Sequence, residues 1–133
     1  MSSRSRVGVR LVRIASVYLL AGLVLGLVMG IGRDFSLLSV HSHVLLLGWA
    51  TLAITGVVYL VLPRCAGSRL ATAHFWLHNL GLPVMMASLA AEALGESHAE
   101  PLIGIGSILV VVGLGLFTVN VLRNAGASDT VES

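Results

Sequence analysis

Four long apolar stretches, separated by short polar segments, make up most of this 133-residue chain. Each stretch is about 20 residues long, which is the length that an α-helix needs to cross the hydrocarbon core of a bilayer. The pattern therefore predicts an all-α membrane protein with four transmembrane helices. We expect these helices at residues 14–31, 37–62, 70–94 and 102–122.

The composition agrees with this prediction. Hydrophobic residues make up 56% of the chain and charged residues 11%, and the mean hydropathy is +0.97. A soluble domain carries about 25% charged residues. A chain of this length holds one domain, which we place at residues 14–123. The single cysteine, Cys65, excludes an internal disulfide.

Charged residues are distributed unevenly, and their distribution predicts a topology. Arginines occur before the first apolar stretch, between the second and third, and after the fourth, whereas the segment between the third and fourth is acidic. The positive-inside rule then puts both termini in the cytoplasm of a bacterium, with the helices in its inner membrane. We expect a basic N-terminal segment at residues 1–13 and a disordered tail at 124–133.

The first arginines are followed at once by an apolar stretch. We therefore interpret them as topology determinants and expect no binding of nucleic acid. The arginines that define the cytoplasmic side are Arg4, Arg6, Arg10, Arg13, Arg64, Arg69 and Arg123.

Two histidines, His41 and His43, lie at the start of the second apolar stretch. An ionisable side chain inside a membrane indicates a functional site by default. Side chains two residues apart on an α-helix point in directions about 200° apart, so these imidazoles cannot easily share one metal ion. One helix would instead serve two separate sites near the outer face. The alternative is a pair of interfacial histidines solvated at the level of the lipid headgroups.

Small residues follow the histidines at a spacing that suits a planar cofactor. Gly48 and Ala50 lie seven residues after His41 and His43, respectively, each on the face of its histidine. Iron porphyrin in a helix bundle needs a neutral imidazole on each axial face and a flat slot for the macrocycle. This spacing therefore leaves room for haem beside His41 and His43, with Gly48 and Ala50 next to the ring. A Cys-x-x-Cys-His attachment motif is absent, which favours non-covalent haem b.

The remaining histidines leave several interpretations open. His74 and His78 are four residues apart and share a helix face. They could form a transition-metal site with Met85, belong to an interfacial aromatic belt, make packing hydrogen bonds, or contact the edge of a cofactor. Their position early in the third helix places them near the inner face, about 30 Å from the outer pair. His98 falls in the outer loop, where we expect it to be solvated.

Glycines form a stripe along the first apolar stretch. Gly22, Gly26 and Gly30 recur every four residues on one helix face. Such a stripe lets a second helix approach closely. The partner helix would belong either to the same protomer or to a neighbouring one.

The segment HSHVLLLGW, from His41 to Trp49, and its continuation GVVYLVLP, ending at Pro63, resemble part of a known family. They are similar to the tenth helix of the catalytic subunit of haem-copper oxidases, most closely the C-type oxidases and nitric oxide reductases. The segment HFWL from His74, followed by Gly81, is similar to the start of the eleventh helix. Together these segments cover about half of the chain. The resemblance implies that His41 and His43 ligate two different haems, one on each side of the helix.

Departures from the family pattern limit what one protomer can do. The family's catalytic subunit has about twelve helices, and the histidines that bind its copper or complete its low-spin haem site have no counterpart here. One protomer therefore cannot be a complete oxidase or reductase, and whether the protein is an enzyme stays open. Three copies around an axis would match the family's three arcs of four helices. We therefore expect a twelve-helix homotrimer rather than a dimer.

Three classes of function follow from these patterns. The first is a b-type haem protein that transfers electrons, with quinol or a respiratory redox protein as its partner, because iron held by two imidazoles favours electron transfer over ligand chemistry. The second is a non-enzymatic accessory protein that handles haem, assists oxidase assembly, or senses nitric oxide or oxygen. The third is a structural membrane subunit without a cofactor.

Overall fold

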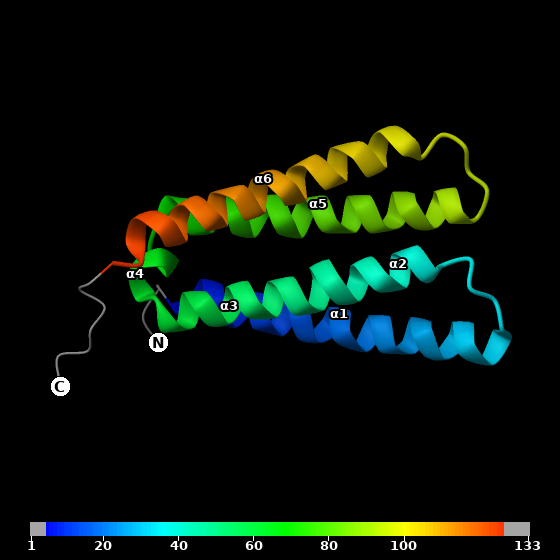
Figure 1. Ribbon diagram of the computed structural model, residues 1–133, viewed down its shortest axis with the longest axis horizontal. Helices are drawn as coiled ribbons and strands as arrows, with labels where there is room; N and C mark the ends of the chain where they lie inside the picture. The colour runs from blue at the N-terminus through cyan, green and yellow to red at the C-terminus, as the bar shows by residue number, and fades with distance from the viewer. Residues whose placement is uncertain (1–4, 127–133) are drawn as a thin grey trace.

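The computed structural model describes residues 5–126, in which every regular element is a helix. These helices form two antiparallel hairpins that lie side by side (Figure 1). The first hairpin pairs α1 (Ser5–Gly32) with one continuous rod. This rod consists of α2 (Leu38–His43), the π-helix η1 (Val44–Thr51) and α3 (Leu52–Val61).

The second hairpin pairs α5 (Arg69–Ala93) with α6 (Glu100–Asn124), and the single turn α4 (Pro63–Ala66) connects the two hairpins. Ser68 caps the start of α5, where its Oγ accepts a hydrogen bond from the Ala71 N–H (3.1 Å). Gly95 ends the helix with a φ of +101°. This left-handed conformation lets the next N–H reach back to the last turn of α5, as in a Schellman motif.

Three of the described helices have the length and composition of membrane-spanning segments. The segment of α1 from Arg6 to Gly32, the α2–η1–α3 rod and α6 are long and apolar enough to cross a bilayer. Helix α5 has the same length as α6, 25 residues, but it carries polar side chains on its buried face, among them His74 and His78. It lies along α6 in the second hairpin (Figure 1).

Glycines bring the two helices of each hairpin together. A Cβ on Gly8 of α1 would lie 2.7 Å from the carbonyl oxygen of Gly56 in α3, and a Cβ on Gly81 of α5 would lie 2.8 Å from that of Gly106 in α6. A larger residue would push the backbones apart at either contact. Small residues at such crossings are usual where helices pair inside membranes.

Two clusters of buried side chains join elements across the bundle. The first lies toward the end of the bundle that holds α4 and consists of Leu11, Ala15, Leu52, Tyr59, Cys65, Ala66 and Ala71. The second connects α2 and η1 of one hairpin to α5 and α6 of the other. It consists of Val40, Val44, Leu82, Met85, Met86 and Val110.

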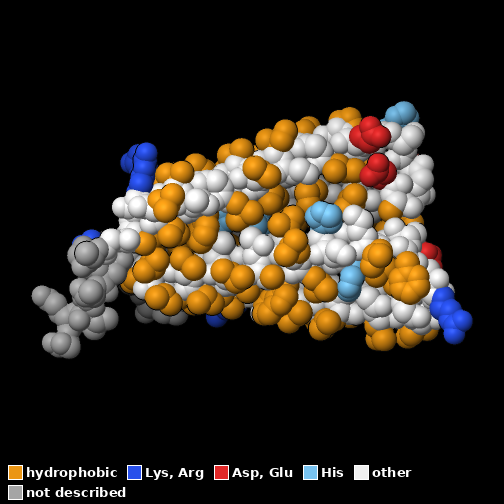
Figure 2. Space-filling model, viewed as in Figure 1, with side chains coloured by type: hydrophobic (Ala, Val, Ile, Leu, Met, Phe, Trp, Pro, Cys, Tyr) orange, Lys and Arg blue, Asp and Glu red, His pale blue; other side chains and the backbone are white. Residues whose placement is uncertain are grey.

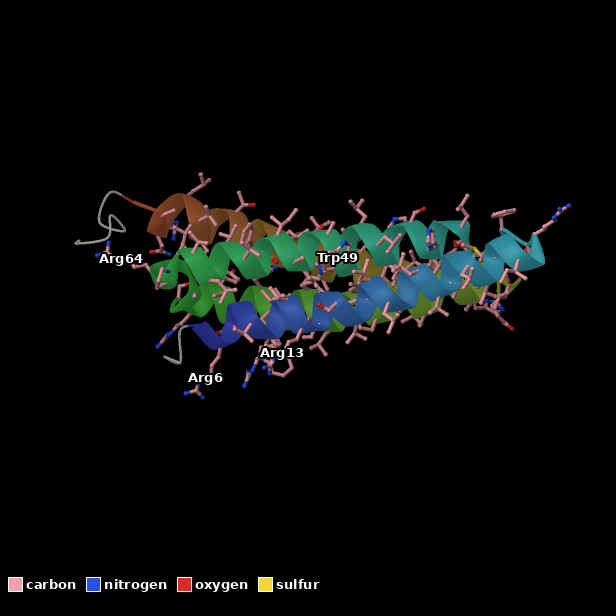
Figure 3. All side chains as sticks on the ribbon, turned by 90° about the horizontal axis from the view of Figure 1, so that it is seen from below. Arg6, Arg13, Trp49 and Arg64 are labelled. Carbon is pink, nitrogen blue, oxygen red and sulfur yellow. The ribbon has the colours of Figure 1, made fainter. Side chains whose placement is uncertain are left out.

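Except for Arg33, which precedes Asp34 in the loop before α2, the described basic and acidic side chains lie toward opposite ends of the bundle. Helix α1 begins at Ser5, so the arginines from Arg6 onward belong to the helix rather than to a separate N-terminal segment. Arg6, Arg13 and Arg64 lie at one end (Figure 3), and acidic side chains gather at the other (Figure 2). The predicted topology requires such a separation. Arg4 and the part of the predicted tail beyond residue 126 lie outside the described residues.

Candidate functional site

His41 lies on the last turn of α2, and its ring rests against α1. A carbonyl oxygen can only accept a hydrogen bond, so the His41 Nδ1–H donates to the carbonyl of Gly22 (3.0 Å). A Cβ on Gly26 would come within 2.7 Å of His41 Cε1. The glycine at position 26 therefore leaves the space that the imidazole fills. A Cβ on Gly30 would meet nothing within 4 Å.

His43, two residues later, makes its hydrogen bond within its own helix. Its Nδ1–H donates to the carbonyl of Ser39 (2.8 Å), one turn earlier. The structure therefore directs the two imidazoles differently, since only His41 bonds to α1. This arrangement agrees with the opposite directions that the i, i+2 spacing requires on an α-helix.

Both outer imidazoles share one chemical feature. Their Nδ1 atoms are protonated and engaged with backbone carbonyls, and neither Nε2 has a hydrogen-bond partner among the described residues. A backbone carbonyl on the other ring nitrogen is the usual second partner of a metal-bound histidine, because it fixes the tautomer and orients the ring. The free Nε2 atoms of His41 and His43 thus fit the axial positions of haem iron.

The outer pair is also accessible. Both side chains are half-buried, and histidine side chains are visible among hydrophobic ones on one face of the bundle (Figure 2). Within the described residues, no three His, Cys, Asp or Glu side chains come close enough to hold a metal ion. One protomer therefore offers two separate imidazole ligands and no enclosed metal centre.

In the structure, the Tyr18 side chain lies beside Gly48, where we predicted space for the haem ring. Gly48 is buried, and a Cβ on it would lie 2.6 Å from Cγ of Tyr18 on α1. Within a protomer, Gly48 therefore accommodates the Tyr18 ring rather than a macrocycle. Ala50 is half-buried, and no polar contact or ring contact involves it.

A π-helix starts directly after His43. Element η1 covers Val44–Thr51, and the Thr51 Oγ–H donates to the Leu46 carbonyl five residues earlier (2.8 Å). Its widened turn leaves the next carbonyl, that of Leu47, available to accept from His78 Nε2–H of α5 (3.1 Å). Single turns of π-helix are rare and are often found at functional sites.

Of the inner pair, His78 lies elsewhere than predicted. His78 bonds to Leu47, which is four residues after His43 and thus only about 6 Å further along the rod. Contrary to the prediction, His78 therefore does not lie a bilayer thickness from His43, whereas His74 bonds to Tyr59, sixteen residues after His43. The predicted separation placed His78 at the level of the nearest loop. In the structure His78 is nine residues beyond Arg69, and α5 runs antiparallel to the α2–η1–α3 rod, so His78 lies well along the bundle.

Both inner histidines are fully buried, so they do not form an interfacial belt. The His74 Nδ1 lies 3.1 Å from the hydroxyl of Tyr59, and its ring packs on Phe117 with centroids 5.3 Å apart. Of the interpretations left open for this pair, packing hydrogen bonds describe the contacts seen. Only Trp76, which is 56% exposed, shows the outward direction expected of a belt residue.

The end of the bundle opposite α4 carries polar side chains in its two loops. His98 is exposed in the loop between α5 and α6, as predicted. In the loop before α2, the Ser36 N–H donates to Asp34 Oδ1 (3.0 Å) and lowers the pKa of this exposed carboxyl group. Its negative charge is therefore retained to more acidic pH than that of an ordinary aspartate.

Comparison of the chain with protein-family models, with curated proteins and with solved structures finds no match. The functional interpretation therefore depends on the geometry of the histidines and on the motif resemblance.

Sequence reasoning missed two features of the site. One is Tyr59 as the partner of His74, and the other is the π-helix that presents Leu47 to His78. The tyrosine had a usable signal, because it lies in the same apolar stretch as the outer histidines. The π-helix has no local signal in the run of leucines at Leu45–Leu47.

Proposed function

We propose that the protein is a b-type haem protein of the bacterial inner membrane, with four transmembrane helices, and that it transfers electrons. His41 and His43 are the iron ligands, and each haem lies between two protomers. Three protomers form a closed ring of twelve helices. Quinol or a respiratory redox protein exchanges electrons with it.

The observation that carries this proposal is the state of the outer imidazoles. In both His41 and His43, Nδ1–H is held by a backbone carbonyl, which leaves Nε2 with a lone pair and no partner among the described residues. The resemblance of the segment around them to the haem-bearing helix of haem-copper oxidases supports the same assignment.

The geometry of the pair supports a haem shared between protomers. His41 rests on α1, whereas His43 bonds only within its own helix, so one protomer does not bring both rings to one iron. The second axial imidazole then has to come from a neighbouring copy. In a closed ring, each interface pairs His41 of one protomer with His43 of the next. Such head-to-tail contacts close only with cyclic symmetry.

Haem held by two imidazoles supplies one-electron transfer when it is bound, and it leaves no open position for a gas ligand. The protein contributes the two axial nitrogens and the backbone carbonyls that orient them. Apolar side chains around the pair, such as Leu38 and Leu46, which are 51% and 61% exposed, would be covered by the neighbouring protomer or by lipid. This apolar covering keeps water from the iron and so influences its potential.

The test is a visible spectrum of the detergent-purified protein, with a haem-to-protein ratio. We expect the sharp bands of reduced b-type haem, about one haem per protomer, and no change on adding carbon monoxide. A colourless protein that takes up no added haem would contradict haem binding and leave a structural subunit. Carbon monoxide binding would contradict ligation by two imidazoles and favour the sensing or haem-handling alternative.

A further inference from the structure

Two buried nitrogen atoms in the bundle core, His74 Nε2 and His78 Nδ1, have no hydrogen-bond partner within residues 5–126. Both side chains are fully buried, and the two rings meet edge to face with their centroids 5.6 Å apart. Buried polar atoms are hydrogen-bonded in the great majority of cases, so we expect each of these nitrogens to have a hydrogen-bond partner. Since the rings are neighbours, one partner can serve both.

The proton of His78 can be placed from its contact with η1. Its Nε2 lies 3.1 Å from the Leu47 carbonyl oxygen, which can only accept, so the proton is on Nε2. Burial disfavours a charged ring, so His78 is neutral. Its Nδ1 therefore carries a lone pair and is an acceptor that lacks a donor.

The proton of His74 follows from Tyr59. The tyrosine is fully buried, so its O–H needs an acceptor, and His74 Nδ1 lies 3.1 Å away. The side-chain oxygen of the neighbouring Asn120 already accepts from Ser68 (2.9 Å) and from Asn124 (2.7 Å). Tyr59 thus donates to Nδ1, and the His74 proton is on Nε2. This N–H is a donor that lacks an acceptor.

We infer that one buried water molecule binds between His74 and His78. It accepts from His74 Nε2–H and donates to His78 Nδ1, so a single molecule satisfies both unpaired atoms. Buried waters commonly bind in this way, with two to four polar partners each. The result is a continuous hydrogen-bonded chain from the Tyr59 hydroxyl through His74, the water and His78 to the Leu47 carbonyl.

A metal ion fits these two nitrogens less well than water. A ligand nitrogen must be deprotonated, yet His74 Nε2 carries the proton for as long as Tyr59 donates to Nδ1. No third His, Cys, Asp or Glu side chain completes a metal site with this pair among residues 5–126. A donor facing an acceptor is the arrangement that a water molecule bridges.

The chain of hydrogen bonds connects the two hairpins where the rod changes from α-helix to π-helix. It runs from Tyr59 on α3 to His74 and His78 on α5 and returns to Leu47 in η1. Leu47 is one turn after His43, so the water site also stabilises the register of the segment that carries the outer histidines. The water site is independent of any cofactor at His41 and His43.

Solid-state NMR of the ¹⁵N-histidine-labelled protein in lipid bilayers tests the inference without altering the core. Signals are assigned by their loss in His74→Phe and His78→Phe variants. We expect both rings to be neutral with the proton on Nε2, and water protons to correlate with His74 Nε2 and His78 Nδ1. A His74 proton on Nδ1, the lack of a water correlation at either atom, or a co-purifying metal ion bound to both rings would overturn the assignment.

Thermal unfolding of the same variants provides a second readout. Phenylalanine keeps the ring packing and removes the polar atoms, so coupling between the two sites reports the shared water. We expect the decrease in melting temperature of the His74→Phe/His78→Phe double variant to be clearly smaller than the sum of the decreases in the two single variants. His74 and Phe117 also touch but share no hydrogen bond, so His74→Phe and Phe117→Leu should be additive. Additive losses for the histidine pair would overturn the water bridge.

Discussion

The outer pair, His41 and His43, and the inner pair, His74 and His78, lie on neighbouring helices, yet their environments differ. His41 and His43 are half-buried, and each keeps Nε2 free. His74 and His78 are fully buried and bond to Tyr59 and Leu47. The first pair is suited to an external ligand, and the second pair holds the helices together.

This difference is the basis on which we propose a ligand role for one pair and a structural role for the other. The residue type is the same for both pairs, so it does not decide the role. Accessibility and the identity of the engaged nitrogen decide it. A backbone carbonyl that accepts from Nδ1–H fixes the tautomer and leaves Nε2 as the ligand atom, as in metal-bound histidines.

Replacing an outer histidine should have the largest effect, and the effect should be on cofactor content. In His41→Ala or His43→Ala, every interface loses one of its two imidazoles. Six-coordinate haem should therefore fall at least about tenfold, as judged from the visible spectrum and the haem-to-protein ratio. His98→Ala is the matched control, because His98 is exposed at the same end of the bundle. Normal six-coordinate haem in either outer variant would contradict the assignment.

Replacing an inner histidine should change stability instead. His78→Ala leaves the Leu47 carbonyl without its partner and opens a cavity, so the free energy of unfolding should fall by about 2–4 kcal/mol. His43→Ala in the haem-free protein should cost about 0.5 kcal/mol or less, since its side chain is half-buried and its hydrogen bond lies within its own helix. Unfolding in mixed micelles measures both. Equal losses would remove the distinction between the pairs.

Two glycines of α1 offer a finer comparison. Gly26→Ala places a Cβ where the His41 ring lies and displaces the ring from the Gly22 carbonyl, at a cost of about 1 kcal/mol and with loss of haem. Gly30→Ala meets nothing within 4 Å and should be neutral or stabilising by about 0.5–1 kcal/mol. Haem titration and unfolding should distinguish the two variants. A Gly30→Ala variant that loses as much haem as Gly26→Ala would show that the His41 contact is irrelevant.

The smallest effect is expected within the π-helix. Thr51 donates to the carbonyl five residues earlier (2.8 Å), and Thr118 donates to the carbonyl four residues earlier in regular α6 (3.0 Å). Thr51→Val should cost about 0.6 kcal/mol, because its bond supports the wide turn that presents Leu47 to His78. Thr118→Val should cost less, since a regular helix needs no such support. A larger loss for Thr118→Val in micelle unfolding would contradict this role.

The helical fold was predictable because hydropathy over about 20 residues reports burial in lipid without any tertiary information. The all-α character and three apolar membrane-length helices are confirmed. The outer histidines were identified for the same reason, since polar residues in an apolar run are conspicuous. The helix ends differ from the predictions mainly in α1, which extends back to Ser5 through the arginines.

The contacts between hairpins could not be predicted from local patterns. The level of His78 depends on how far α5 slides along the α2–η1–α3 rod, and the buried cluster that joins Leu82 of α5 to Val40 and Val44 of the rod helps to set its position. The role of Gly48 depends on Tyr18, which is thirty residues away in sequence. Both facts belong to tertiary packing, on which hydropathy and spacing carry no information.

Co-assembly of the two outer variants tests the central claim, a haem shared between protomers, most directly. His41→Ala and His43→Ala chains are co-expressed in equal amounts, purified together and assayed for haem held by two imidazoles. Each chain alone should hold none. In a head-to-tail ring, random mixing pairs an intact His41 with an intact His43 at about a quarter of the interfaces, so about a quarter of the original haem should return. No recovery in mixed oligomers, or full six-coordinate haem in either variant alone, would contradict the shared site.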